Sequence, residues 1–341
     1  MPSSREDPFE PVEINGMSLD NRFVRSATWL GLCDDGFVTD RVVERYRELS
    51  FGGPGAIVTG IVTVSPTEVP LLGMADLSDD RFIEGHRRLV EAIHEGGSKA
   101  IVQLAISSYG VEEGGWFIEK EVDDLRDSDM GRIVALFGEA AVRAVRAGYD
   151  GIQIHVAHFF FLSRCVSPLV NHRTDVYGGT AANRARLVAG IVAEVRSRLG
   201  SGYPILAKVN GTDDHTGGIS KEDLLVLCRV LEDSGIDAVE VSGNNTSRRG
   251  IAPGRGEGYF MEYAKAVKRG TGLKVIGVGG FRSIDAVTAA LGSIDMVSIS
   301  RPLIREPDLI ARWRNGYRGP SACVSCNACY STPGHVCRFS R

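Results

Sequence analysis

Short, continuous runs of apolar and β-branched residues recur along the chain and form its clearest pattern. A strand with one exposed face alternates apolar and polar residues, whereas a strand buried on both faces is apolar throughout. The runs therefore predict eight buried strands, at residues 22–28, 55–60, 99–105, 150–155, 204–210, 237–243, 274–279 and 295–300.

Helical patterns separate most of these runs. Apolar residues recur every three to four positions over 131–147 and 184–199, which is the spacing of one helix face. Residues 221–234 follow Ser220, which stands three positions before Asp223 as in a capping box. Strands that alternate with helices predict an α/β protein built as a (β/α)8 TIM barrel. A doubly wound sheet is less favoured, because no G-x-G-x-x-G follows the first strand.

The composition indicates a globular protein and narrows its partners. The chain has 341 residues, 43% of them hydrophobic and 24% charged, which suits one large barrel. A net charge of -4 argues against nucleic acid as a partner, because phosphate binding requires a basic surface. The N-terminus does not resemble a signal peptide, and no apolar segment approaches the ~20 residues that cross a bilayer. We therefore expect a cytoplasmic protein that does not bind membranes.

Four of the seven cysteines lie close together near the C-terminus, as Cys323-x2-Cys326-x2-Cys329-x7-Cys337. This spacing is typical of metal or iron–sulfur ligands. Thiols stay reduced in the cytoplasm, which favours metal binding over disulfides. A zinc site and a set of unligated thiols are the alternatives. We divide the chain into a barrel at 1–320 and a Cys-rich tail at 321–341.

Barrel enzymes carry their reacting groups just after the C-terminal ends of the strands. Gly279-Gly280 and Ser300-Arg301 end the last two predicted strands, where backbone N–H groups and an arginine can hold a phosphate. The amide of Gln103 suits the pyrimidine edge of a flavin, and the Lys208 ammonium can stabilise the negative charge of a reduced flavin ring. An interior glutamine and a lysine in a structural ion pair are the alternatives.

Two histidines, His155 and His158, stand where the fourth predicted strand becomes a loop. A pair of imidazoles at a barrel mouth can donate hydrogen bonds to a substrate carbonyl or another anionic oxygen. The pair can also bind a metal, but the nearby sequence offers no clear third ligand. We therefore expect substrate binding.

Several of these motifs together resemble the Old Yellow Enzyme family of FMN-dependent NADH:flavin oxidoreductases, which are (β/α)8 barrels. The resemblance covers about residues 8–315 and is strongest in His155-Val156-Ala157-His158, Ser167-Pro168-Leu169 and the segment from Asn171 to Arg184. It implies that His155 and His158 bind the activating oxygen of a small-molecule substrate, with NAD(P)H as co-substrate. It also implies FMN contacts at Ala27, Thr28, Gly60, Gln103, Lys208, Gly279, Gly280, Ser300 and Arg301.

The tail resembles the iron–sulfur segment of the branch that holds 2,4-dienoyl-CoA reductase and trimethylamine dehydrogenase. This implies a [4Fe–4S] cluster bound by Cys323, Cys326, Cys329 and Cys337, although the last interval is shorter than in those relatives. The chain ends at Arg341, without their extra nucleotide-binding domains.

Three aromatic residues are expected at the substrate. Phe160 stands where many relatives have a proton-donating tyrosine, and a phenyl ring cannot transfer a proton. Trp29 stands where relatives often have a cysteine or tyrosine near the flavin, and Tyr259 is expected in a loop over the mouth.

The leading hypothesis is an ene-reductase, which transfers hydride from reduced FMN to an alkene conjugated to a carbonyl. An alternative is an FMN/iron–sulfur dehydrogenase that oxidises an amine or similar donor and exports electrons through the cluster to an electron-transfer protein. A third hypothesis is a non-catalytic electron-transfer or scaffold protein. The sequence leaves homo-oligomerisation open.

Overall fold

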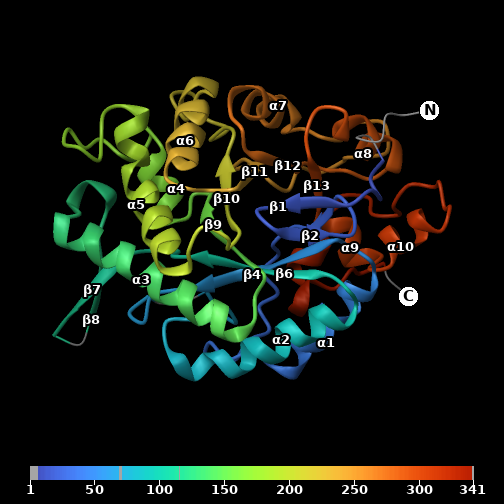
Figure 1. Cartoon of the computed structure of the whole chain (residues 1–341), viewed down its shortest axis with the longest axis horizontal. Helices are drawn as coiled ribbons and strands as arrows, with labels where there is room; N and C mark the ends of the chain where they lie inside the picture. The colour runs from blue at the N-terminus through green and yellow to red at the C-terminus, as the bar shows by residue number, and fades with distance from the viewer. Residues whose placement is uncertain (1–6, 69–70, 115, 340–341) are drawn as a thin grey trace.

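Eight parallel strands form a closed barrel in the computed structural model of the chain, which describes residues 7–68, 71–114 and 116–339. The first barrel strand pairs with both the last and the second, which closes the sheet. The predicted (β/α)8 TIM barrel is therefore confirmed (Figure 1). The barrel strands are β3 (Phe23–Arg25), β4 (Ala56–Thr63), β6 (Lys99–Ala105), β9 (Gly151–Val156), β10 (Ile205–Asn210), β11 (Ala238–Ser242), β12 (Lys274–Gly277) and β13 (Met296–Ile299).

Helices cover the outside of the barrel between successive strands (Figure 1). Helix α6 begins as predicted, because the Ser220 hydroxyl accepts from the Asp223 N–H while the Asp223 carboxylate accepts from the Ser220 N–H. Helix α3 begins four residues earlier than predicted, where the Asp129 carboxylate accepts a hydrogen bond from the Arg126 N–H. The helices are α1 (Asp40–Phe51), α2 (Ile83–Glu95), α3 (Asp127–Ala147), α4 (Phe161–Val166), α5 (Ala181–Leu199), α6 (Lys221–Asp233), α7 (Met261–Gly270), α8 (Ile284–Leu291), α9 (Arg301–Arg305) and α10 (Leu309–Arg314).

Short elements fill the long connections after β4 and β6. Strand β4 continues past its predicted end to Thr63, through a register shift between Val58 and Ile61. Figure 1 shows the β7–β8 hairpin projecting from the barrel at the lower left. These elements and the two turns of the tail are β5 (Ala75–Asp76), β7 (Gly110–Glu113), β8 (Trp116–Glu119), η1 (Asp80–Phe82), η2 (Val122–Asp124), η3 (Ala328–Ser331) and η4 (Pro333–His335).

An N-terminal hairpin closes one end of the barrel. Strands β1 (Val12–Ile14) and β2 (Met17–Leu19) are antiparallel, and their buried side chains pack against residues inside the barrel, including Ile101 and Ile276. Apolar packing therefore occupies the N-terminal end, and the C-terminal ends of the strands carry the polar side chains described below.

Within the described residues, no helix combines the length and the apolar character that a membrane span requires.

Candidate functional site

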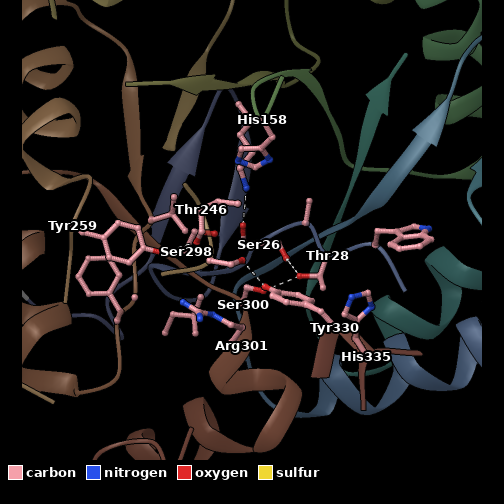
Figure 2. Close-up of a pocket in the computed structure, with 18 of the residues that line it drawn as sticks. Ser26, Thr28, His158, Thr246, Tyr259, Ser298, Ser300, Arg301, Tyr330 and His335 are labelled. Atoms are coloured by element: carbon pink, nitrogen blue, oxygen red, sulfur yellow. Dashed lines mark hydrogen bonds between the residues drawn. The ribbon is translucent and has the colours of Figure 1, made fainter. Parts of the chain in front are cut away.

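A cavity of about 390 Å³ opens at the C-terminal ends of the barrel strands, a volume within the usual range of ligand pockets. Figure 2 shows His158 on one side of it and Arg301, Tyr330 and His335 on the opposite side. Most of the residues predicted to contact the flavin or the substrate meet here. Those that line the cavity are Ala27, Thr28, Trp29, His158, Lys208, Tyr259, Gly280, Ser300 and Arg301.

Two buried arginines stand at one end of the cavity, next to Gly280 and Ser300. Arg301 is 5% exposed, and its Nη1 atom donates to the Arg248 carbonyl (2.9 Å). Arg282 is 1% exposed and donates to the Phe281 carbonyl (2.8 Å). Within the described chain, neither guanidinium lies at ion-pair distance from a carboxylate. Buried charge is costly unless it is paired, so this end of the cavity is suited to an anion.

Gly280 allows its own backbone to lie close to the Tyr259 ring at that end of the cavity. Its φ is +81°, a left-handed conformation, and an added Cβ would lie 2.8 Å from Tyr259 Cε1. Gly279 has φ +131° and accepts a backbone hydrogen bond from the Tyr259 N–H (3.1 Å). Tyr259 donates its hydroxyl proton to the Thr246 carbonyl (2.6 Å), which fixes the ring at the cavity wall.

A chain of buried polar side chains crosses the barrel below the cavity. Lys208 Nζ lies 3.1 Å from Glu240 Oε1 and 2.9 Å from Ser26 Oγ. Gln153 Nε2 donates to Glu240 Oε2 (3.0 Å), and Gln103 Nε2 donates to Gln153 Oε1 (2.6 Å). Burial alone would raise the pKa of Glu240, but Lys208 and the hydrogen bonds lower it, which favours the charged carboxylate. Lys208 is thus both an ion-pair partner and a cavity residue, whereas Gln103 is an interior residue of the polar chain.

The two predicted histidines lie together at the end of β9. Their ring centroids are 5.1 Å apart, and His158 Nε2 lies 2.9 Å from Ser242 Oγ. His158 has a φ of 63°, and its N–H donates to Asn210 Oδ1 (3.1 Å), which holds the turn. His155 Nδ1 is buried and has no hydrogen-bond partner, so it is available to a bound ligand.

Both imidazoles are neutral at neutral pH. Burial lowers the pKa of His155 well below its ordinary value, and the neighbouring His158 and Lys208 lower it further. Burial and Lys208 lower the pKa of His158 to about 3. A neutral imidazole can still donate one hydrogen bond, so the pair can bind a carbonyl oxygen without carrying charge.

The apolar side of the site contains Phe160 and Trp29. The ring centroids of Phe160 and His155 are 4.9 Å apart. Phe160 also packs on the cluster of Ile61, Met74 and Ala105. Trp29 is half-exposed and separates the main cavity from a second, narrow one that Gly60 lines. Gly60 is in close contact with the segment that follows β3, because an added Cβ would lie 2.9 Å from the Thr28 carbonyl oxygen.

The C-terminal tail supplies two cavity residues that the sequence analysis missed. Tyr330 and His335 line the main cavity, and their rings are 5.0 Å apart. The His335 ring also lies 5.8 Å from Trp29, and the Tyr330 hydroxyl lies 2.9 Å from Ser247 Oγ. No sequence pattern indicates this contact, because it depends on how the tail folds back over the barrel. Arg282 was also missed, although it closely follows the predicted Gly279-Gly280 turn.

The four tail cysteines line a third, small cavity. Arg301, Arg305 and Arg338 line the same cavity, so its surroundings are positively charged. Burial raises the pKa of Cys329, and the neighbouring thiols of Cys323 and Cys337 raise it further. In the described part of the chain, no group of three or more His, Cys, Asp or Glu side chains is arranged to bind a single metal ion. This finding applies to the four cysteines as well as to His155 and His158.

Comparison with known proteins gives consistent matches over the barrel. A family model described as the NADH:flavin oxidoreductase / NADH oxidase family matches residues 7–318. A metal reductase of Desulforamulus reducens is 32% identical over 337 residues, which cover 94% of this chain and 50% of that protein. A bilirubin reductase of Clostridium symbiosum is 32% identical over 357 residues, which cover 93% of this chain and 92% of that protein.

A solved structure of histamine dehydrogenase from Rhizobium sp. 4-9 superposes with a TM-score of 0.79 at 25% identity, covering 92% of this chain and 48% of that one. The chain thus spans about half the length of the metal reductase and the histamine dehydrogenase, and nearly all of the bilirubin reductase.

Proposed function

Because this chain belongs to the NADH:flavin oxidoreductase / NADH oxidase family, we propose that it is an FMN-dependent ene-reductase with NAD(P)H as electron donor. Its substrate is an alkene conjugated to a carbonyl group. The observation that carries this proposal is the arrangement of one cavity, with unpaired buried arginines at one end and Lys208 and His158 at the other, where the neutral His158 ring packs against the neutral ring of the buried His155. The reductases among its relatives support the direction of the reaction.

The cavity suits FMN at both of its ends. The phosphate of FMN supplies the anion that Arg282 and Arg301 lack, next to the backbone at Gly280 and the hydroxyl of Ser300. At the other end, the Lys208 ammonium can hold the negative charge that a reduced flavin ring carries. Ala27 and Thr28 also line this cavity, whereas the FMN contacts expected of Gly60, Gln103 and Gly279, which do not line it, remain predictions.

When bound and reduced, FMN supplies a hydride to the β-carbon of the alkene. His155 and His158 have the task of stabilising the negative charge that then develops on the carbonyl oxygen. Each imidazole donates a hydrogen bond to that oxygen, and one well-placed donor contributes ~2–4 kcal/mol to lowering the barrier. Phe160 cannot donate a proton, so the proton for the α-carbon comes from another group or from water.

We also propose that the tail binds a [4Fe–4S] cluster through Cys323, Cys326, Cys329 and Cys337. The shared cavity of these four thiols and the arginines around it support this assignment, because a thiolate cluster is negatively charged. Three further expectations remain predictions. They are the division into a barrel at 1–320 and a tail at 321–341, cytoplasmic residence, and the formation of a homo-oligomer.

A second candidate function keeps both cofactors and reverses the electron flow. The similarity to histamine dehydrogenase favours a dehydrogenase that oxidises an amine and passes electrons through the cluster to an electron-transfer protein. Phe160 agrees with this candidate, since the reaction needs no proton donor at that position. Trp29, Phe160 and Tyr259 would contact the substrate in either reaction.

Anaerobic stopped-flow absorption separates the two candidates. If NAD(P)H alone bleaches the flavin and an added enone restores its colour, the protein is an ene-reductase. If NAD(P)H leaves the flavin oxidised and an amine bleaches it, the ene-reductase assignment is wrong and the dehydrogenase is correct.

A further inference from the structure

A third buried guanidinium lies beside the main cavity, away from the two arginines already described. Arg25 ends strand β3 and is 2% exposed. Its Nη1 atom lies 2.6 Å from the Ser26 carbonyl oxygen and 2.6 Å from Thr28 Oγ1. Its Nε atom is buried and has no hydrogen-bond partner. In the part of the chain that the structure describes, no carboxylate lies at ion-pair distance from it.

Thr28 connects this arginine to the cavity. The Thr28 side chain lines the cavity, and its hydroxyl lies 2.9 Å from Ser300 Oγ, which also lines it. Figure 2 shows both hydroxyls together at the cavity wall, close to Tyr330 and His335. The Thr28 side chain therefore lies between the Arg25 guanidinium and a ligand bound in the cavity.

The groups around Arg25 do not neutralise it. Burial lowers the pKa of Arg25 to about 10, and the other groups that act on its charge are Tyr46 and Arg45 of α1, Tyr330 of the tail, and Glu240 of β11. Glu240 is the one carboxylate among them, and it already pairs with Lys208. Of the two buried cations Lys208 and Arg25, only Lys208 lies at ion-pair distance from a carboxylate within the described residues.

An uncompensated buried charge is costly, and such charges are found where a ligand or a reaction supplies the opposite charge. The hydrogen bonds to Ser26 and Thr28 do not require a charge, because a neutral amide could donate them. The positive charge itself therefore needs a partner, and the occupant of the cavity is the nearest candidate.

We infer that Arg25 is a positioning residue that fixes the Thr28 hydroxyl and supplies positive charge to the flavin site, so that reduced FMN binds more tightly than oxidised FMN. This inference rests on the proposed function. An added buried cation stabilises the extra negative charge of the reduced ring and raises the reduction potential of the bound flavin.

The test compares Arg25→Met and Arg25→Gln with the wild-type holoprotein. Glutamine keeps a hydrogen-bond donor for Thr28 but removes the charge. For both variants, we expect the preference for reduced over oxidised FMN to fall about tenfold, the order expected for one partly screened charge at short range. For a two-electron couple, this corresponds to a midpoint potential lower by about 30 mV. Anaerobic redox titration of the bound flavin measures it directly.

Two further variants complete the design. Arg25→Lys keeps the charge and should restore most of the wild-type potential. Arg47→Met removes an arginine of α1 that pairs with Glu44 and Glu95 at the surface, and should leave the potential unchanged. If Arg25→Met does not fold, Arg25→Gln decides the question alone.

A wild-type potential in Arg25→Gln with FMN bound would overturn the inference, because the charge would then have no effect on the flavin. A raised potential would overturn it equally. Failure of the wild-type protein to bind FMN is a different result, and it would refute the proposed function itself.

Discussion

The guanidinium of Arg301 is held by the C-terminal tail, since its Nη1 atom lies 2.5 Å from Asn327 Oδ1. Asn327 in turn donates from Nδ2 to the Ser247 carbonyl (2.6 Å). Arg301 lines both the main cavity and the cavity of the four cysteines. The two candidate cofactor sites therefore share a wall, and the tail helps to shape the proposed phosphate site.

Removing this contact should weaken FMN binding. In Asn327→Ala, the Arg301 guanidinium loses a hydrogen bond worth roughly 1.5–3 kcal/mol, so we expect the Kd for FMN to rise by about one to two orders of magnitude. Quenching of flavin fluorescence on titration measures the Kd. Asn315→Ala, at the exposed end of α10, is the matched control and should bind FMN normally. An unchanged Kd in Asn327→Ala would show that the tail does not shape the phosphate site.

The histidine pair should affect turnover more than flavin content. We expect His155→Ala and His158→Ala each to lower the rate of enone reduction by ~10²–10³, because each variant loses one donor to the developing oxyanion. The FMN content should stay near the wild-type value. His172→Ala, an exposed histidine that pairs with Asp123, is the control and should retain the rate. Undiminished turnover in both site variants would remove their proposed role.

Acid should destabilise the fold through its buried histidines. The pKa of His158 is lowered to about 3 and that of His86 to about 4, in both cases mainly by burial. The unfolded chain binds these protons near pH 6.5 and the folded chain does not, so stability falls as the pH falls from about 6.5 towards 4. Each histidine accounts for roughly 3 kcal/mol of this loss.

Urea unfolding at several pH values tests this expectation. His158→Gln should lose less stability than the wild type between pH 7 and pH 4, because glutamine does not titrate. His172→Gln, at the surface, should follow the wild-type curve. Identical pH dependence in His158→Gln and the wild type would contradict a neutral, buried imidazole.

The tail cysteines should bind iron. Protein purified without oxygen is expected to contain iron and sulfide in equal amounts, and Cys329→Ser should lose most of both. Cys33→Ala changes a thiol outside the tail and should keep the iron. Zinc in place of iron, or full iron content in Cys329→Ser, would contradict the proposed cluster.

The barrel was predictable because buried parallel strands leave continuous apolar runs, and all eight predicted strands are present. The same regularity predicts that Lys208, Gly280, Ser300 and Arg301 lie at one end of the barrel. Their positions follow from topology alone, since every strand of a parallel barrel ends at the same face.

The walls of the site were less predictable, because they depend on contacts between segments far apart in the sequence. Nothing near Tyr330 or His335 indicates that the tail folds back to line the cavity. The FMN contact of Gln103 stays a prediction, and the polar chain that holds its side chain depends on Gln153 and Glu240, which belong to other strands. Arg25 lies within an apolar run, where only the structure shows that its charge is unpaired.

Titration of flavin-free protein with FMN, followed by flavin fluorescence and by absorption near ~450 nm, tests the central claim most directly. The account predicts a yellow protein that takes up one FMN per chain and quenches its fluorescence. A correctly folded, colourless protein that takes up no FMN would contradict the account, whatever the tail cysteines bind.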